Sequence, residues 1–239
     1  MKKWLKYLLL GLLALIIVGF LIFFIWTQQT YGPSEEMTRL VEEPLQKDGW
    51  VVHEPSEKSK VGVILYPGAK VEAEAYSFLA QQLATEGYVT GIPNMTLNLP
   101  ILNSNKAREM MERYPKVEDW YVGGHSLGGV AAASFVKDHP DETAGLILFA
   151  SYPTEGSSFA NLETPILSIY AEKDGLTTES KIEETEPLLS SDATLYEIEG
   201  GNHAQFGMYG AQKGDLPAEI PAKRQQEIIV RTIHEWIQN

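Results

Sequence analysis

The chain has 239 residues, no cysteine and a net charge of −13 at pH 7. This length allows one domain with a sizeable core. The absence of cysteine excludes disulfides, thiolate-bound metals and a lipid-modified cysteine, and the acidic balance argues against nucleic acid or an anionic surface as a partner. The sequence contains no paired-histidine metal motif and no phosphate-binding loop, so we expect neither a metal nor an organic cofactor.

The N-terminus has the pattern of a membrane anchor. Lys2, Lys3 and Lys6 precede an uncharged apolar run over residues 7–26, and a helix of that length reaches about 30 Å, enough to cross a bilayer. A cleaved signal peptide and a buried core helix are the alternatives, but the run offers no small-residue cleavage site. The lysines favour a cytoplasmic N-terminus over residues 1–6. We therefore predict a single-pass protein of the cell membrane whose remaining chain lies outside.

The rest of the chain alternates between predicted strands and helices. A polar stretch over residues 27–43 is predicted to be a tether, with local order near residues 37–41, and one domain is predicted over residues 44–239. Strands are expected over residues 50–53, 61–66, 88–92, 119–122, 144–150, 165–170 and 193–199, and helices over 72–86, 103–114, 129–136 and 221–237. This alternation predicts an α/β fold, with a mostly parallel sheet that helices cover on both faces.

The most informative motif is Gly124-His125-Ser126-Leu127-Gly128, between the strand at 119–122 and the helix at 129–136. A G-x-S-x-G sequence in this setting is typical of a nucleophile elbow, a strained turn that exposes a serine Oγ at the start of a helix. An ordinary glycine-rich turn is the alternative. The flanking strand and helix favour the elbow, so Ser126 is the predicted nucleophile.

An acid and a base follow in the order that such an elbow requires. Asp174 lies in the loop after the strand at 165–170, and His203 lies in the loop after the strand at 193–199. Glu172 is the rival acid, but the Asp-Gly pair favours a turn beyond the strand end and hence Asp174. A plain surface histidine is the alternative for His203. The other histidines are poorer candidates because they lie in a strand, beside the nucleophile or on helices: His53, His125, His139 and His234.

Two backbone N–H groups are candidates for an oxyanion hole. One belongs to Leu127, directly after the nucleophile, and the other to Ala69, in the loop after the strand at 61–66. Gly68 lets that loop turn without a Cβ penalty, although a plain turn would look the same. Lys70 is a candidate substrate-facing charge, with a solvated lysine as the alternative.

The cleft is predicted to be open. Only residues 151–164 separate the strand at 144–150 from the next strand, which is too short for a cap domain. Tyr152, Phe206 and Tyr209 are candidates to line the cleft, and each has packing within a loop as its alternative.

These stretches resemble the α/β-hydrolase superfamily and, more narrowly, the small bacterial alpha/beta hydrolase fold-5 group, which is akin to dienelactone hydrolases. The matching stretches are residues 66–71, 124–129, 170–175 and 201–207, and the resemblance covers the chain from about residue 49 to the C-terminus. Ala69 departs from the second glycine that the group often carries, although an alanine N–H still donates. The resemblance implies an α/β-hydrolase fold and a hydrolase, without naming a substrate.

Together these features predict a membrane-anchored, carboxylesterase-like serine hydrolase that cleaves a small or accessible acyl ester through Ser126, His203 and Asp174. Acyl transfer or thioester cleavage by the same triad is the enzymatic alternative. A catalytically silent surface binding module on a hydrolase fold is the alternative from another class.

Overall fold

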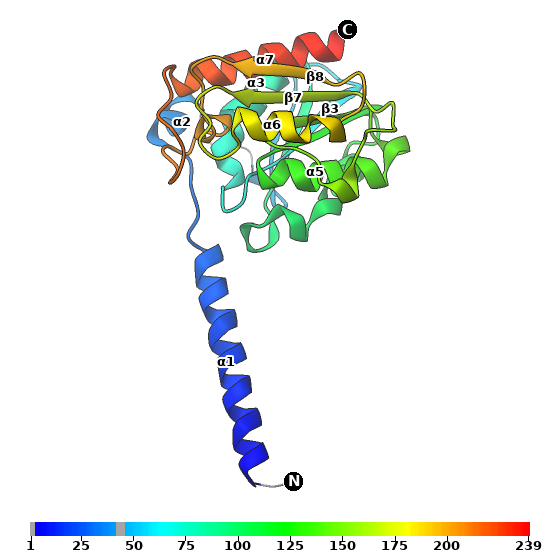
Figure 1. Cartoon of the computed structure of the whole chain (residues 1–239). Coiled ribbons are helices and arrows are strands. Elements are labelled where there is room, and N and C mark those ends of the chain that lie inside the picture. The colour runs from blue at the N-terminus through cyan, green and yellow to red at the C-terminus, as the bar shows by residue number, and fades with distance from the viewer. Residues whose placement is uncertain (1–2, 42–45) are drawn as a thin grey trace.

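The computed structural model describes residues 3–41 and 46–239, so Lys2 and the predicted end of the tether at residue 43 lie outside the described residues. A long helix, α1 (Lys3–Thr27), projects from one end of the folded domain (Figure 1). Its apolar side chains are exposed, and within the described residues it is the one helix that is long and apolar enough to cross a membrane.

The domain is built on an eight-stranded sheet with the order β1-β2-β4-β3-β5-β6-β7-β8. The strands are β1 (Gln46–Lys47), β2 (Trp50–His53), β3 (Val61–Tyr66), β4 (Val89–Pro93), β5 (Asp119–His125), β6 (Gly145–Phe149), β7 (Ile166–Ala171) and β8 (Thr194–Ile198). The pairings of β2 with β1 and with β4 are antiparallel, and all others are parallel. The predicted α/β class is confirmed.

Helices cover both faces of this sheet (Figure 1). The α-helices of the domain are α2 (Glu35–Leu40), α3 (Ser77–Thr85), α4 (Ala107–Arg113), α5 (Leu127–Asp138), α6 (Glu179–Thr185) and α7 (Ala222–Gln238). Short 3₁₀ turns are η1 (Ala73–Tyr76), η2 (Thr96–Asn98), η3 (Pro100–Leu102), η4 (Ser104–Lys106), η5 (Pro140–Glu142), η6 (Glu155–Ser157), η7 (Glu186–Leu188) and η8 (Ala204–Phe206).

Alternation along the strands divides the core into two layers. On β3, Val63 and Leu65 pack with residues of α3 and α7, whereas Ile64 and Tyr66 pack with residues of α4 and α5. A strand buried on both faces needs apolar residues at every position. This requirement explains why β3 is a continuous apolar run in the sequence.

Strand β5 runs three residues further than predicted, up to the elbow. Its last residues pair in parallel with β6, and His125 lies opposite Phe149. A Cβ on Gly123 would lie 2.3 Å from the carbonyl oxygen of Ile147, so only glycine fits at that point. The extension delivers Ser126 directly at the carboxyl edge of the sheet.

The predicted tether is not a free linker, because residues 27–41 pack on the domain. Ser34 caps α2 by accepting a hydrogen bond from the Met37 N–H at 3.2 Å. Met37 and Val41 are buried against Phe78 and Met208. α2 lies where local order was expected near residues 37–41, whereas the packing was not predicted because the two buried apolar residues find partners far along the chain.

Candidate active site

The elbow at Ser126 has the strained backbone that its motif predicts. Ser126 has φ 52° and ψ −122°, a conformation that residues other than glycine rarely adopt. A Cβ on Gly124 would lie 2.5 Å from the Gly128 carbonyl carbon, and one on Gly128 would lie 2.3 Å from the Tyr66 carbonyl oxygen. The Ser126 N–H donates to the Phe149 carbonyl at 2.9 Å, and Ser151 Oγ donates to the Ser126 carbonyl at 2.6 Å. These bonds hold the strained turn in place.

Asp174 and His203 meet at the same edge of the sheet. Asp174 Oδ2 lies 2.8 Å from His203 Nδ1, and both side chains are buried. Asp174 Oδ1 accepts hydrogen bonds from the N–H groups of Leu176 and Thr177 at 2.7 and 2.6 Å. These bonds hold the Asp174 carboxylate in place. Because a carboxylate only accepts hydrogen bonds, the His203 tautomer that fits this contact carries its proton on Nδ1. Nε2 then has its lone pair free to take a proton.

Glu172, the rival acid, points away from this contact. Its Oε2 accepts from the Gly200 N–H at 2.8 Å, and its Oε1 pairs with Lys173 Nζ at 2.7 Å at the protein surface. The hydrogen bonds from Lys173 and Gly200 lower the pKa of the Glu172 carboxyl. Glu172 therefore serves as a surface contact between the two loops.

The His203 ring packs against the residue that precedes Ser126. The ring of His203 lies 4.5 Å, centroid to centroid, from the ring of His125, the residue directly before Ser126. The described hydrogen bonds do not include one between Ser126 Oγ and His203. Such bonds are often long before a substrate binds and shorten in the complex.

The two predicted oxyanion donors have N–H groups that are free of acceptors in the described part of the chain. Leu127 is the first residue of α5, where helix geometry leaves the N–H unpaired. Around Ala69 the neighbouring donors are occupied: the Gly68 N–H donates to Tyr76 Oη at 2.9 Å, and the Lys70 N–H donates to the Asn98 carbonyl at 2.7 Å. The Ala69 N–H thus remains available for an anionic oxygen.

A buried Tyr76–His125 pair fixes the loop that carries Ala69. Tyr76 Oη lies 2.8 Å from His125 Nδ1 while it accepts from the Gly68 N–H. Burial raises the pKa of the Tyr76 hydroxyl and lowers the pKa of the His125 imidazole, so both groups are neutral. The contact is therefore a hydrogen bond between two neutral groups. This link could not be predicted from the sequence because 49 residues separate the partners.

Two of the aromatic residues expected to line the cleft pack inside the domain instead. Phe206 is fully buried, with its ring stacked against those of His125 and Phe149 at 5.7 and 5.8 Å. Tyr209 is buried, and its hydroxyl donates to Gln212 Oε1 at 2.8 Å. Both rings lie close to the ring of His125. Large aromatic side chains gain stability when they are buried, which favours these packed positions.

The remaining two candidates lie at the rim of the domain. Tyr152 is half-buried, and Lys181 Nζ lies 5.2 Å from the centre of its ring. Lys70 is half-buried and places its Nζ 4.6 Å from the centre of the Trp26 ring in α1. Lys70 therefore contacts the end of α1 rather than standing free in solvent.

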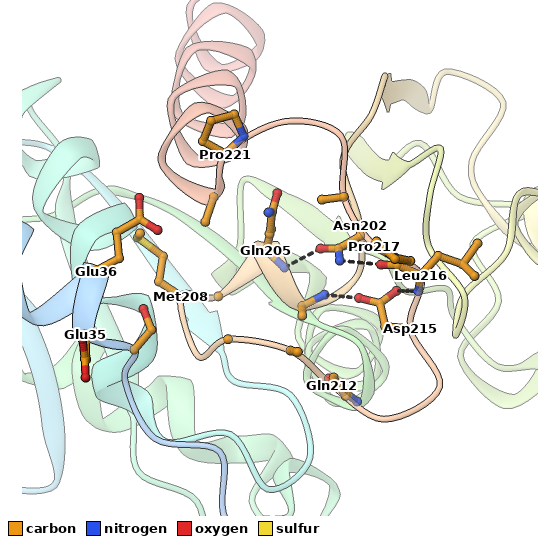
Figure 2. A pocket seen from close by; sticks show the side chains of 17 residues that line it. Glu35, Glu36, Asn202, Gln205, Met208, Gln212, Asp215, Leu216, Pro217 and Pro221 are labelled. Carbon is orange, nitrogen blue, oxygen red and sulfur yellow. Dashed lines mark hydrogen bonds between the residues drawn. The ribbon is translucent and has the colours of Figure 1, made fainter.

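Asp215, which no sequence motif marks, contacts the loops of both Asp174 and His203. Its Oδ2 accepts from the Ala204 N–H at 2.9 Å, and its Oδ1 accepts from the N–H groups of Gly175 and His203 at 3.0 and 3.4 Å. One carboxylate thus joins the loop of Asp174 to the loop of His203. Figure 2 shows Asp215 beside Leu216, whose N–H donates to Asp215 Oδ1, at the edge of a cavity of about 660 Å³. Residues of α2 and residues that follow β8, among them Asn202, Gln205 and Met208, line this cavity. The lining of this cavity includes neither Ser126 nor His203.

We predict that Asp215→Ala lowers kcat by about ten- to a hundredfold, because a displacement of His203 by a fraction of an ångström misaligns proton transfer. The measurement is steady-state hydrolysis of a short ester, with circular dichroism to verify folding. Asp192→Ala, at an exposed carboxylate that accepts a hydrogen bond from the neighbouring Ser191, is the matched control and is expected to keep its activity. Equal activity of the Asp215 variant and the control would show that the two loops hold themselves in place.

The described residues contain no cluster of three or more His, Cys, Asp or Glu side chains that could hold a metal ion.

The sheet order, the elbow and the loop positions define a hydrolase of the α/β class. A model of the alpha/beta hydrolase family matches residues 62–227, and the chain belongs to that family. The predicted α/β-hydrolase fold without a cap domain is thereby confirmed. The narrower likeness to dienelactone hydrolases stays a prediction, and no curated protein matches the chain.

Solved structures share the fold at low sequence identity. Est1E from Butyrivibrio proteoclasticus is 14% identical with a TM-score of 0.60, over 81% of this chain and 98% of that one. One structure from work on the metagenome-derived lipolytic enzymes LipS and LipT is 14% identical with a TM-score of 0.60, over 82% of this chain and 100% of that one. A monoacylglycerol lipase from Paleococcus ferrophilus is 14% identical with a TM-score of 0.57, over 78% of this chain and 98% of that one.

Proposed function

We propose that the chain is a serine hydrolase that cleaves acyl esters and that its catalytic domain lies on the outer side of the cell membrane. The observation that carries this proposal is the contact between buried Asp174 and His203 at 2.8 Å, on the sheet edge that also presents the strained Ser126. The esterases and lipases among the structural relatives support ester hydrolysis as the reaction class.

The reaction follows from the positions of these groups. His203 Nε2 takes the proton of Ser126 Oγ as the oxygen attacks the ester carbonyl, and Asp174 stabilises the imidazolium that forms. The N–H groups of Ala69 and Leu127 bind the oxyanion, and each donor contributes about 3 kcal/mol to the transition state. His203 then gives its proton to the leaving alcohol. Water, activated in the same way, releases the acyl group from Ser126.

The absence of a cap leads to a prediction about soluble substrates. For p-nitrophenyl esters dissolved as monomers, we expect kcat/KM to peak at acyl chains of roughly two to six carbons, because residues 151–164 offer no cover for a longer chain. In a covered tunnel, each further buried CH₂ would add about 0.8 kcal/mol to the binding free energy of the substrate. The measurement is a chain-length series on the detergent-solubilised protein, with kcat/KM calculated from the concentration of ester free in water and with Ser126→Ala as the blank. A value that rises steadily to twelve carbons would contradict the open cleft.

The lysines at the N-terminus lead to a prediction about topology. Protease added to intact protoplasts is expected to digest the domain beyond Thr27, because basic residues stay on the cytoplasmic side. Protection until lysis would show the opposite orientation. Recovery of a soluble form that begins near Thr27 would show that α1 is a cleaved signal.

A further inference from the structure

The end of α1 is joined directly to the loop that carries Ala69. Asn98 Nδ2 donates to the carbonyl of Thr27, the last residue of α1, at 3.0 Å. The carbonyl of the same Asn98 accepts the Lys70 N–H at 2.7 Å, and Thr27 is fully buried. A single residue thus connects the helix end with the proposed oxyanion loop.

The segment that follows α1 is fixed to the same loop. Tyr31 forms a parallel bridge with Val71, in which the Tyr31 N–H donates to the Lys70 carbonyl at 2.7 Å. Thr30 Oγ1 also donates to Glu72 Oε1 at 2.6 Å. Four extended residues span at most about 14 Å, so these contacts keep the loop close to the end of α1.

The contact between Trp26 and Lys70 holds this loop beside the end of α1, which the anchoring proposed above places at the membrane surface. Trp26 ends the apolar run of α1, and tryptophan is enriched where a spanning helix leaves the membrane. Lys70 Nζ lies 4.6 Å from the centre of its ring, and a lysine there can place its charge among lipid headgroups. Ala69, directly before Lys70, therefore lies near headgroup level.

Exposed apolar side chains lie in several of the connections that leave the carboxyl ends of the strands. Outside α1, the described residues include four large apolar side chains that are 41–52% exposed: Ile101, Leu102, Leu176 and Leu216. They lie in the connections that follow β4, β7 and β8, at the carboxyl edge that carries the site. Ile101 and Leu102 lie three and four residues beyond Asn98, so they are nearest to the helix end.

We propose that this edge rests on the bilayer and that the substrate is a lipid ester presented at the membrane surface. The proposal rests on the function and anchoring proposed above. The cleft has no cap to bury a long acyl chain, and each CH₂ drawn from the bilayer into water costs about 0.8 kcal/mol. An active site held at headgroup level meets the ester bond while the chain stays in the bilayer.

The test uses the full chain in phosphatidylcholine vesicles with two fluorogenic esters, 4-methylumbelliferyl butyrate in solution and 4-methylumbelliferyl oleate in the bilayer. One variant carries a 20-residue Gly-Ser insertion between Gln28 and Gln29, which lets the domain move by about 25 Å. A second variant combines Ile101→Ser with Leu102→Ser. Its matched control is Glu57→Ser with Lys58→Ser, at exposed positions before β3 on the opposite edge.

We expect the ratio of oleate to butyrate hydrolysis to fall at least tenfold with the insertion and several-fold with the Ile101 and Leu102 substitutions, and to stay unchanged in the control. An unchanged ratio in both variants, equal loss of both activities, or a wild type that cleaves butyrate but not bilayer oleate would overturn the inference and leave the hydrolase intact. A wild type that cleaves neither ester, or a Ser126→Ala variant that cleaves butyrate normally, would overturn the proposed function itself.

Discussion

Ser126→Ala and His203→Ala are each expected to lower ester hydrolysis by at least about a thousandfold. The first removes the oxygen that attacks the carbonyl, and the second removes the base that takes its proton. A residual rate is expected from the proposed Ala69 and Leu127 donors, which remain able to bind the oxyanion. The measurement is kcat/KM for a short p-nitrophenyl ester.

The double variant with both substitutions provides the control for this prediction. Because the two residues act as one unit, the double variant is expected to be about as slow as either single variant. Multiplied losses would show that Ser126 and His203 act independently, which contradicts a shared proton transfer. Undiminished hydrolysis by Ser126→Ala would exclude this serine as the nucleophile.

Asp174→Asn is expected to lower kcat by about a thousandfold or more while the fold is retained. The N–H groups of Leu176 and Thr177 both donate to Asp174 Oδ1, so the amide oxygen of asparagine has to take that place. The amide NH₂ then faces His203 Nδ1 and donates to it. This moves the imidazole proton to Nε2, where the ring can no longer accept the proton of Ser126.

Glu172→Gln is the matched control for Asp174→Asn, since it removes a carboxylate only two residues away. Its activity is expected to stay within about threefold of the wild type, because Glu172 contacts Lys173 and Gly200 at the surface. The comparison uses kcat/KM for one ester and thermal unfolding of both variants. If Glu172→Gln were the damaging change, the acid would be misassigned.

The sequence was sufficient for the fold because its signals are local. Continuous apolar runs mark β3, β6 and β7, since strands buried on both faces need them. The glycines around Ser126 mark the elbow, because their Cβ atoms would overlap neighbouring backbone. The loops after β7 and β8 then lie at one edge, as parallel strands require, and this brings Asp174 to His203.

The missing parts depend on contacts between distant segments. Asp215 lies 40 residues from Gly175, and no local pattern marks it as the residue that joins the two catalytic loops. The packing of residues 27–41 depends on Met208 and on Val71, far along the chain. Phe206 lies in the same loop as His203, and this position made it a candidate to line the cleft. Only its stacking on His125 and Phe149 shows that it belongs to the core.

Covalent labelling by a fluorophosphonate tests whether Ser126 is an activated nucleophile, because the reagent reports such a serine without knowledge of the substrate. Intact-mass and peptide analysis of the labelled protein is expected to show one adduct, on Ser126. The label should be lost in Ser126→Ala and strongly slowed in His203→Ala, which keeps the serine but lacks its base. Labelling at another residue, or no labelling of a folded wild-type protein, would contradict the account.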